Sequence, residues 1–226
     1  MSFFTPSFAK RSLTALILAP LVILLTVQAG WPFIALISLM LAVSLWEWGG
    51  MVFKLPEGIG RLLLFVAGIA YLCLAHFALV KLEVGFHYAL VVTLFFMVWG
   101  SDTCAYLLGK AIGGPKLAPK ISPNKTWAGL LGAVLGSALL GFAASYYLLP
   151  KTDFAALAGQ PHLLIGAVLG LVGQAGDLMI SAVKRKAGVK DASQIIPGHG
   201  GVLDRIDALL LVGLVYLAAI VVLTAG

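Results

Sequence analysis

Residues 61–80 read RLLLFVAGIAYLCLAHFALV, an apolar run about as long as the 20 residues that a helix needs to cross a bilayer. Comparable runs lie on both sides of it. Glycine and proline mark most of the breaks between these runs. We therefore predict an all-α integral membrane protein with about seven transmembrane helices, which forms one domain over residues 1–226 without a separate soluble domain. The predicted spans are 12–29, 32–53, 61–80, 86–109, 127–149, 161–183 and 206–225.

The overall composition supports this class. Of the 226 residues, 61% are hydrophobic and only 11% are charged, against about 25% charged residues in an ordinary soluble domain. The net charge of +6 does not indicate a nucleic-acid partner, because the basic residues lie in short segments between apolar runs. Such a distribution is typical of the residues that set membrane topology.

The basic residues predict the orientation. With seven spans, thirteen of the 15 lysines and arginines fall on one side, and only Lys81 and Lys151 fall on the other. The positive-inside rule then places the N-terminus and the two long segments 110–126 and 184–205 in the cytosol. The compact, loop-poor chain favours a bacterial inner membrane.

Acidic residues inside the predicted spans are the first indication of function. Asp102, Asp177, Asp204 and Asp207 all fall near the cytosolic ends of their helices. A charged residue at the centre of a membrane helix costs about 2.5–3.5 kcal/mol on insertion scales, so each of these acids needs a partner or an ion. Carboxylate oxygens suit Mg²⁺, which shares its coordination with substrate phosphates.

The spacing of the polar residues sharpens this expectation. Asp177, Ser181 and Lys184 stand at positions i, i+4 and i+7 and therefore share one helical face. Opposite paired carboxylates, such a face can hold a divalent cation and a phosphate together. An alternative for Asp204 and Asp207 is that they only stabilise the N-terminus of the last helix. We interpret Glu47, between two tryptophans, as an interfacial acid within an aromatic belt.

Two cytosolic segments complete the candidate site. Residues 109–126 read GKAIGGPKLAPKISPNKT, and glycines in such a segment allow the backbone to approach a phosphate closely. Residues 184–205 interleave basic residues with acids and a Gly-His-Gly-Gly run. A solvated positive-inside loop explains some of these charges, but it does not explain the acids or the glycines.

Three motifs in the C-terminal 60% of the chain resemble a known family. Residues 181–207, SAVKRKAGVKDASQIIPGHGGVLDRID, are similar to the signature of phosphatidate cytidylyltransferases, which are also called CDP-diacylglycerol synthases. Residues 102–109, DTCAYLLG, and 122–129, SPNKTWAG, are similar to two further motifs of that family. The chain departs from the family at Ala128, where glutamate is usual.

The resemblance implies that CTP and phosphatidate react to give CDP-diacylglycerol and pyrophosphate. It implies Mg²⁺, with Asp177 and Asp204 as metal ligands, a possible second cation, and a homodimer in contact with membrane lipid. The expected catalytic residues are Asp177, Asp204, Lys184, Ser181, Asp207 and Asp102. The expected substrate-binding residues are Lys125, Ser122, Thr126, Arg185, Lys190, His199, Gly200, Gly201 and Arg205.

Two other functions fit part of the pattern. A CTP-dependent polyprenol kinase would also use lysines and acids at the cytosolic face. A cation-coupled transporter would explain intramembrane acids, but these acids cluster at one face without a chain of ionisable groups reaching the other. The motif of CDP-alcohol phosphotransferases is absent from the sequence.

Overall fold

The computed structural model describes the backbone of residues 6–196 and 198–225, and their side chains from Leu16 onward except that of Gln160. Seven long helices form the bundle: α1 (Pro6–Gln28), α2 (Trp31–Val52), α3 (Ile59–Val84), α4 (Tyr88–Ile112), α5 (Trp127–Leu148), α6 (Gln160–Lys186) and α7 (Leu203–Ala225). Each predicted apolar run is thus a helix. Pro197 and the side chains of Lys10 and Arg11 lie outside the described residues.

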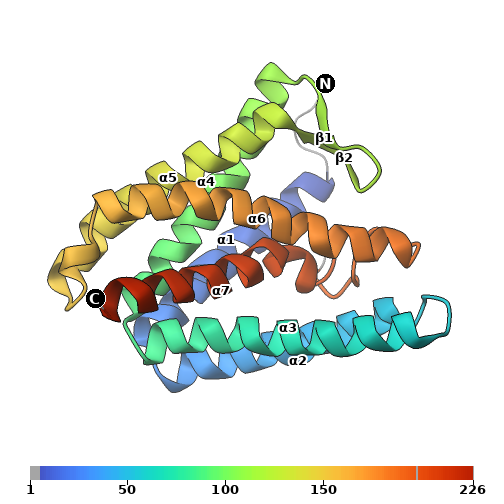
Figure 1. Cartoon of the computed structure of the whole chain (residues 1–226), viewed down its shortest axis with the longest axis horizontal. Helices are drawn as coiled ribbons and strands as arrows, with labels where there is room; N and C mark the ends of the chain where they lie inside the picture. The colour runs from blue at the N-terminus through green and yellow to red at the C-terminus, as the bar shows by residue number, and fades with distance from the viewer. Residues whose placement is uncertain (1–5, 197, 226) are drawn as a thin grey trace.

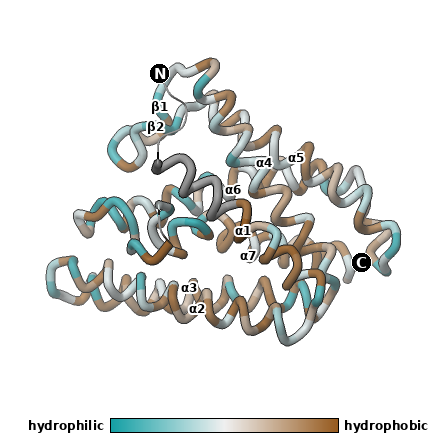
Figure 2. The backbone as a smooth tube through the Cα atoms, turned by 180° about the vertical axis from the view of Figure 1, so that it is seen from behind, coloured by the Kyte–Doolittle hydropathy of each residue, from teal (hydrophilic) through white to brown (hydrophobic). Residues whose placement is uncertain are grey.

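Six of these helices, α2 to α7, are long and apolar enough to cross a membrane by length and composition. The described part of the first helix contributes a shorter apolar stretch, Leu16–Gln28. Polar segments gather in the connections, while the helices themselves are mostly hydrophobic (Figure 2). The protein is therefore a helical, multi-pass membrane protein, in agreement with the composition.

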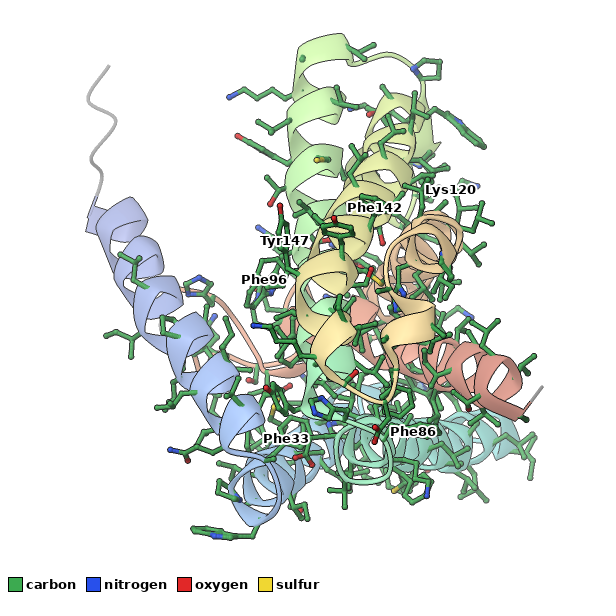
Figure 3. All side chains as sticks on the ribbon, turned by 90° about the vertical axis from the view of Figure 1, so that its left-hand side faces the viewer. Phe33, Phe86, Phe96, Lys120, Phe142 and Tyr147 are labelled. Carbon is green, nitrogen blue, oxygen red and sulfur yellow. The ribbon has the colours of Figure 1, made fainter. Side chains whose placement is uncertain are left out.

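The helices pack in an order that differs from their order in the chain. Helix α5 packs against both α4 and α6, α7 packs against α6 and α3, and α2 packs on α3 (Figure 1). Viewed from one end, α1 lies along one side of the bundle, away from α5 and α6 (Figure 3). The apolar core follows the same path, with Leu72, Leu94, Leu169 and Tyr216 buried between α3, α4, α6 and α7.

Small residues allow three of these helices to approach closely. A Cβ atom at Gly136 of α5 would overlap the backbone oxygen of Gly100 in α4. A Cβ atom at Gly166 of α6 would lie 2.6 Å from the backbone oxygen of Ser137 in α5. Small residues at helix interfaces are the usual way that membrane helices gain packing contacts. The α4–α5–α6 group is therefore a tightly packed unit beside the site.

The structure is helical, as predicted, and adds one short pair of strands. The segment 109–126 contains a short antiparallel hairpin, β1 (Lys116–Ala118) and β2 (Ser122–Thr126), with Lys116 opposite Thr126 and Ala118 opposite Ser122. Two turns of 3-10 helix, η1 (Leu149–Lys151) and η2 (Ala155–Leu157), connect α5 to α6. The hairpin, the end of α6 and the connection between α2 and α3 all lie at the same end of the bundle (Figure 1).

Candidate active site at the hairpin end of the bundle

A buried ion pair joins the end of α6 to the start of α7. Lys184 Nζ lies 2.6 Å from Asp204 Oδ1, with only 8% and 3% of the two side chains exposed. The second carboxylate oxygen of Asp204 accepts hydrogen bonds from the backbone N–H groups of Ala192 (2.8 Å) and Gly201 (2.9 Å). Both oxygens of this buried carboxylate are therefore satisfied by the protein, as a buried charge requires.

A second lysine–aspartate pair involves Asp177, about two turns before Lys184 in α6. Lys125 Nζ, from β2, lies 2.7 Å from Asp177 Oδ2 and donates a hydrogen bond to Gln174 Oε1 at 2.7 Å. Ser181 Oγ donates to the other oxygen of Asp177 at 3.0 Å. The predicted shared face of Asp177 and Ser181 is confirmed, and the hairpin adds its lysine to that face.

Two more aspartates surround this pair. Asp207 is 8% exposed, and its Oδ1 accepts the N–H of Ala208 at 2.8 Å. It interacts electrostatically with Asp177, Lys184 and Asp102, and Asp102 interacts with Asp177 and Lys125. The structure thus brings together the four aspartates that the sequence singled out, from α4, α6 and α7.

The close contact of α6 with α7 fixes this arrangement. A Cβ atom at Gly176 would lie 2.9 Å from the backbone oxygen of Asp207 and 3.1 Å from Leu211 Cβ. Glycine at this position therefore allows the backbone beside Asp177 to touch the backbone of Asp207. A larger residue would separate the two carboxylates.

The segment between α6 and α7 surrounds a cavity of about 580 Å³. Four of the predicted substrate-binding residues line it: Lys190, His199, Gly200 and Arg205. Among the described residues, the buried Nδ1 of His199 has no hydrogen-bond partner. Gly200 has φ +86° and a Cβ atom there would lie 2.9 Å from Asp204 Oδ2. The loop therefore turns tightly around Asp204 and presents basic groups to an open space.

Four other predicted substrate-binding residues make structural contacts. Thr126 Oγ1 caps α5 by accepting the N–H of Gly129 at 3.0 Å, and Ser122 pairs with Ala118 in the hairpin. Arg185 is exposed and donates to the backbone oxygens of Ile121 and Val189, so that it ties the hairpin to the end of α6. Gly201 is buried against the side chain of a residue from α2. Their binding of substrate stays a prediction.

That α2 residue is Glu47, and its interpretation as an interfacial acid is wrong. Glu47 is 1% exposed, and its carboxylate accepts hydrogen bonds from Ser193 Oγ, from Val202 N and from Leu203 N. It is therefore buried against the segment that connects α6 to α7. The only sequence signal for this role is a carboxylate placed within an apolar run, since its partners lie about 150 residues away.

The donor set has the chemistry that a divalent cation needs. No group of three or more histidines, cysteines or acids in metal-binding geometry occurs among the residues that the structure describes. However, Asp102, Asp177 and Asp207 are close enough to repel one another, and such a concentration of negative charge favours a bound cation. The side chain of Asp204 is only 3% exposed, whereas that of Asp177 is 34% exposed, so Asp177 fits the predicted metal site better than Asp204 does.

Fold and site together define a multi-pass membrane protein with a cluster of acids and cations at one end of its bundle. Comparison with known proteins places it in the cytidylyltransferase family, whose model matches residues 55–223, and the chain belongs to this family. The chain is 43% identical over 146 residues to a phosphatidate cytidylyltransferase of Brucella suis, a match that covers 65% of this chain and 51% of that protein.

Two relatives from Rickettsia have the same name. The chain is 34% identical over 207 residues to the phosphatidate cytidylyltransferase of Rickettsia conorii, a match that covers 91% of this chain and 87% of that protein. It is 43% identical over 123 residues to that of Rickettsia felis, which covers 54% of each chain. The chain thus spans about half the length of the Brucella relative but most of the length of the one from Rickettsia conorii.

Proposed function

We propose that this protein is a phosphatidate cytidylyltransferase that converts CTP and phosphatidate to CDP-diacylglycerol and pyrophosphate in phospholipid synthesis. One observation carries the proposal. Two aspartate-bound lysines, Lys125 and Lys184, lie at the same end of the bundle as a cavity lined by Lys190, His199 and Arg205. This concentration of cations suits the phosphates of a nucleotide and of a lipid. The names of the relatives from Brucella and Rickettsia support the same reaction.

The chain's own residues hold and orient the two phosphates. Lys125, Lys184 and Arg205 neutralise phosphate oxygens, Ser181 donates a hydrogen bond, and His199 donates from its unpartnered nitrogen. An oxygen of the lipid phosphate then attacks the α-phosphorus of CTP, and the bond from that phosphorus to the bridging oxygen breaks to release pyrophosphate. No strong general base is needed, because a phosphomonoester with a second pKa of about 6 is already ionised near pH 7.

Asp177, with Asp204, Asp102 and Asp207 around it, would hold Mg²⁺. When bound, the ion neutralises phosphate charge and orients the phosphates. Asp102 and Asp207 would add negative charge beside this ion or hold a second cation.

The membrane setting is part of the proposal. All seven helices span, the N-terminus is cytosolic, and the hairpin end of the bundle faces the cytosol, where CTP is available. The host membrane is a bacterial inner membrane, which the bacterial sources of the relatives support. Phosphatidate reaches the site laterally from the inner leaflet, and two copies form a homodimer.

Position-labelled CTP tests the reaction. With phosphatidate in vesicles and Mg²⁺, label in the α-phosphate should enter the lipid product, and label in the γ-phosphate should leave as pyrophosphate. Entry of the γ label into lipid would instead show a kinase. Absence of any lipid product from folded protein, with several lipids and nucleotides tried, would refute the proposal.

A further inference from the structure

The most deeply buried acid at this end of the bundle is not one of the clustered aspartates. Glu47 of α2 is 1% exposed and accepts three hydrogen bonds: from Ser193 Oγ at 2.5 Å, from Val202 N at 2.9 Å and from Leu203 N at 2.7 Å. No lysine or arginine among the described residues forms an ion pair with it. Its charge is therefore stabilised by the first backbone N–H groups of α7 and by one hydroxyl group.

These bonds close the base of the loop that lines the cavity. Asp204 accepts hydrogen bonds from Ala192 and Gly201, which lie on the two arms of the loop. Glu47 accepts hydrogen bonds from the next residue on each arm, Ser193 and Val202. The backbone bridge between Ile196 and Gly200 lies further out in the same loop. Glu47 of α2 and Asp204 of α7 thus each link the two arms of the loop, at adjacent positions.

The fit around Glu47 also explains a glycine of the signature motif. A Cβ atom at Gly201 would overlap Glu47 Oε1 and lie 2.8 Å from Glu47 Cδ. Glycine at this position therefore leaves room for the carboxylate rather than for a substrate. Glu47 and Ser193 also line a second cavity, of about 640 Å³. Gln194 lines both cavities, so the segment that Glu47 holds contributes to the walls of both.

From these contacts we infer that Glu47 is a positioning residue. It fixes the loop 192–203 so that Lys190, His199 and Arg205 face the cavity in the geometry that binds nucleotide phosphates. This inference rests on the proposed function for its choice of substrate, but the loop-closing role itself does not depend on it. Glu47 touches neither substrate nor metal in this account and acts only through the loop.

The direct test is hydrogen–deuterium exchange of the full-length protein with Glu47→Gln. The glutamine amide has only one acceptor oxygen and would place an N–H₂ group against donors, so it cannot accept all three bonds. Exchange of the amides at 192–206 should become about 5- to 30-fold faster, which is the range expected for the loss of one helix cap. The matched control is Glu83→Gln. Glu83 is also buried, with 4% exposed, and accepts the N–H of Gly30 at 2.7 Å, far along the sequence from this loop.

Kinetics give a second readout that a general loss of stability would not move. Glu47→Gln should raise the KM for CTP by about 5- to 30-fold while the KM for phosphatidate changes less than about two-fold, and Glu83→Gln should change neither. Equal exchange at 192–206 in wild type and Glu47→Gln would overturn the inference. Faster exchange together with an unchanged KM for CTP would show that Glu47 closes the loop but does not affect nucleotide binding. An inactive wild type with faster exchange in the variant would refute the proposed function and leave the loop-closing role supported.

A double-mutant cycle adds an independent check. Gly201→Ala should by itself displace the Glu47 carboxylate, so its effect on the KM for CTP should largely vanish in a Glu47→Ala background. Multiplicative effects of the two substitutions would show that Gly201 and Glu47 act separately, which would contradict the inference.

Discussion

Lys184 Nζ lies 2.6 Å from Asp204 Oδ1, and this buried contact joins the last turn of α6 to the first turn of α7. The two residues are separated by the whole cavity-lining loop. Their pairing therefore closes that loop, while Asp177 and Lys125 form the second ion pair of the site, earlier in α6. Four predictions test this arrangement.

Breaking the buried pair should destabilise the protein. Lys184→Met leaves the carboxylate of Asp204 buried without its cation, which typically costs about 3–5 kcal/mol. The double variant Lys184→Met/Asp204→Asn removes both charges but keeps an acceptor oxygen for the N–H groups of Ala192 and Gly201, so it should recover most of the lost stability without recovering activity. Thermal unfolding in detergent measures the first effect and product formation the second. A single variant as stable as the wild type would show that the pair is not buried as described.

Lys125 should matter for catalysis more than for stability. Its side chain is partly accessible, and its ammonium group stands between Asp177 and Gln174 where a phosphate can reach it. Lys125→Ala should lower kcat/KM by about 10²–10³-fold, as removal of one charge-stabilising donor does in other enzymes. The exposed hairpin residue Lys120, visible in Figure 3, supplies the control Lys120→Ala, which should keep near-normal activity. Equal losses in both variants would indicate a general effect of hairpin charge.

Gly176 should tolerate no side chain. Gly176→Ala places a Cβ atom 2.9 Å from the backbone oxygen of Asp207, so α6 and α7 must move apart at the site. We expect a stability loss of about 1–3 kcal/mol, typical of overpacking, and a fall in activity. Gly60→Ala is the control, because nothing lies within 4 Å of the added atom. If unfolding measurements and activity assays found the two alanine variants alike, α6 and α7 would not be in contact here.

The acid cluster predicts a requirement for a divalent cation. Chelation should abolish activity, and Mg²⁺ should restore it. Asp102→Asn removes one of the charges near Asp177, so half-maximal activity should need about ten-fold more Mg²⁺. Titration of activity with Mg²⁺ measures this shift. An unchanged Mg²⁺ requirement would show that Asp102 does not contribute to binding of the cation.

Much of the bundle could be predicted from the sequence, because a bilayer dictates helix length and composition. The predicted run 61–80 is the core of α3, which extends to Ile59–Val84. The last helix begins at Leu203, three residues before the predicted start. Its first N–H groups are satisfied by Glu47, a partner from α2 that hydropathy cannot reveal.

The candidate site was predictable where its geometry is local. Asp177 and Ser181 share a helical face by spacing alone, and their hydrogen bond confirms that expectation. The hairpin and the role of Glu47 were not predictable in this way. Segment 109–126 has the composition of a loop, and it is held by long-range contacts such as that of Arg185 with the backbone oxygen of Ile121. These contacts depend on the packing of helices that are distant in the sequence.

The central claim is that the cluster around Asp177 transfers cytidylyl groups to phosphatidate. The most direct measurement is the formation of labelled CDP-diacylglycerol from α-labelled CTP, phosphatidate and Mg²⁺ by wild type, Asp177→Asn and Asp153→Asn. Asp153 is an exposed acid between η1 and η2 and serves as the matched control. The account predicts product from the wild type and from Asp153→Asn, and almost none from folded Asp177→Asn. Equal product from all three proteins would contradict it.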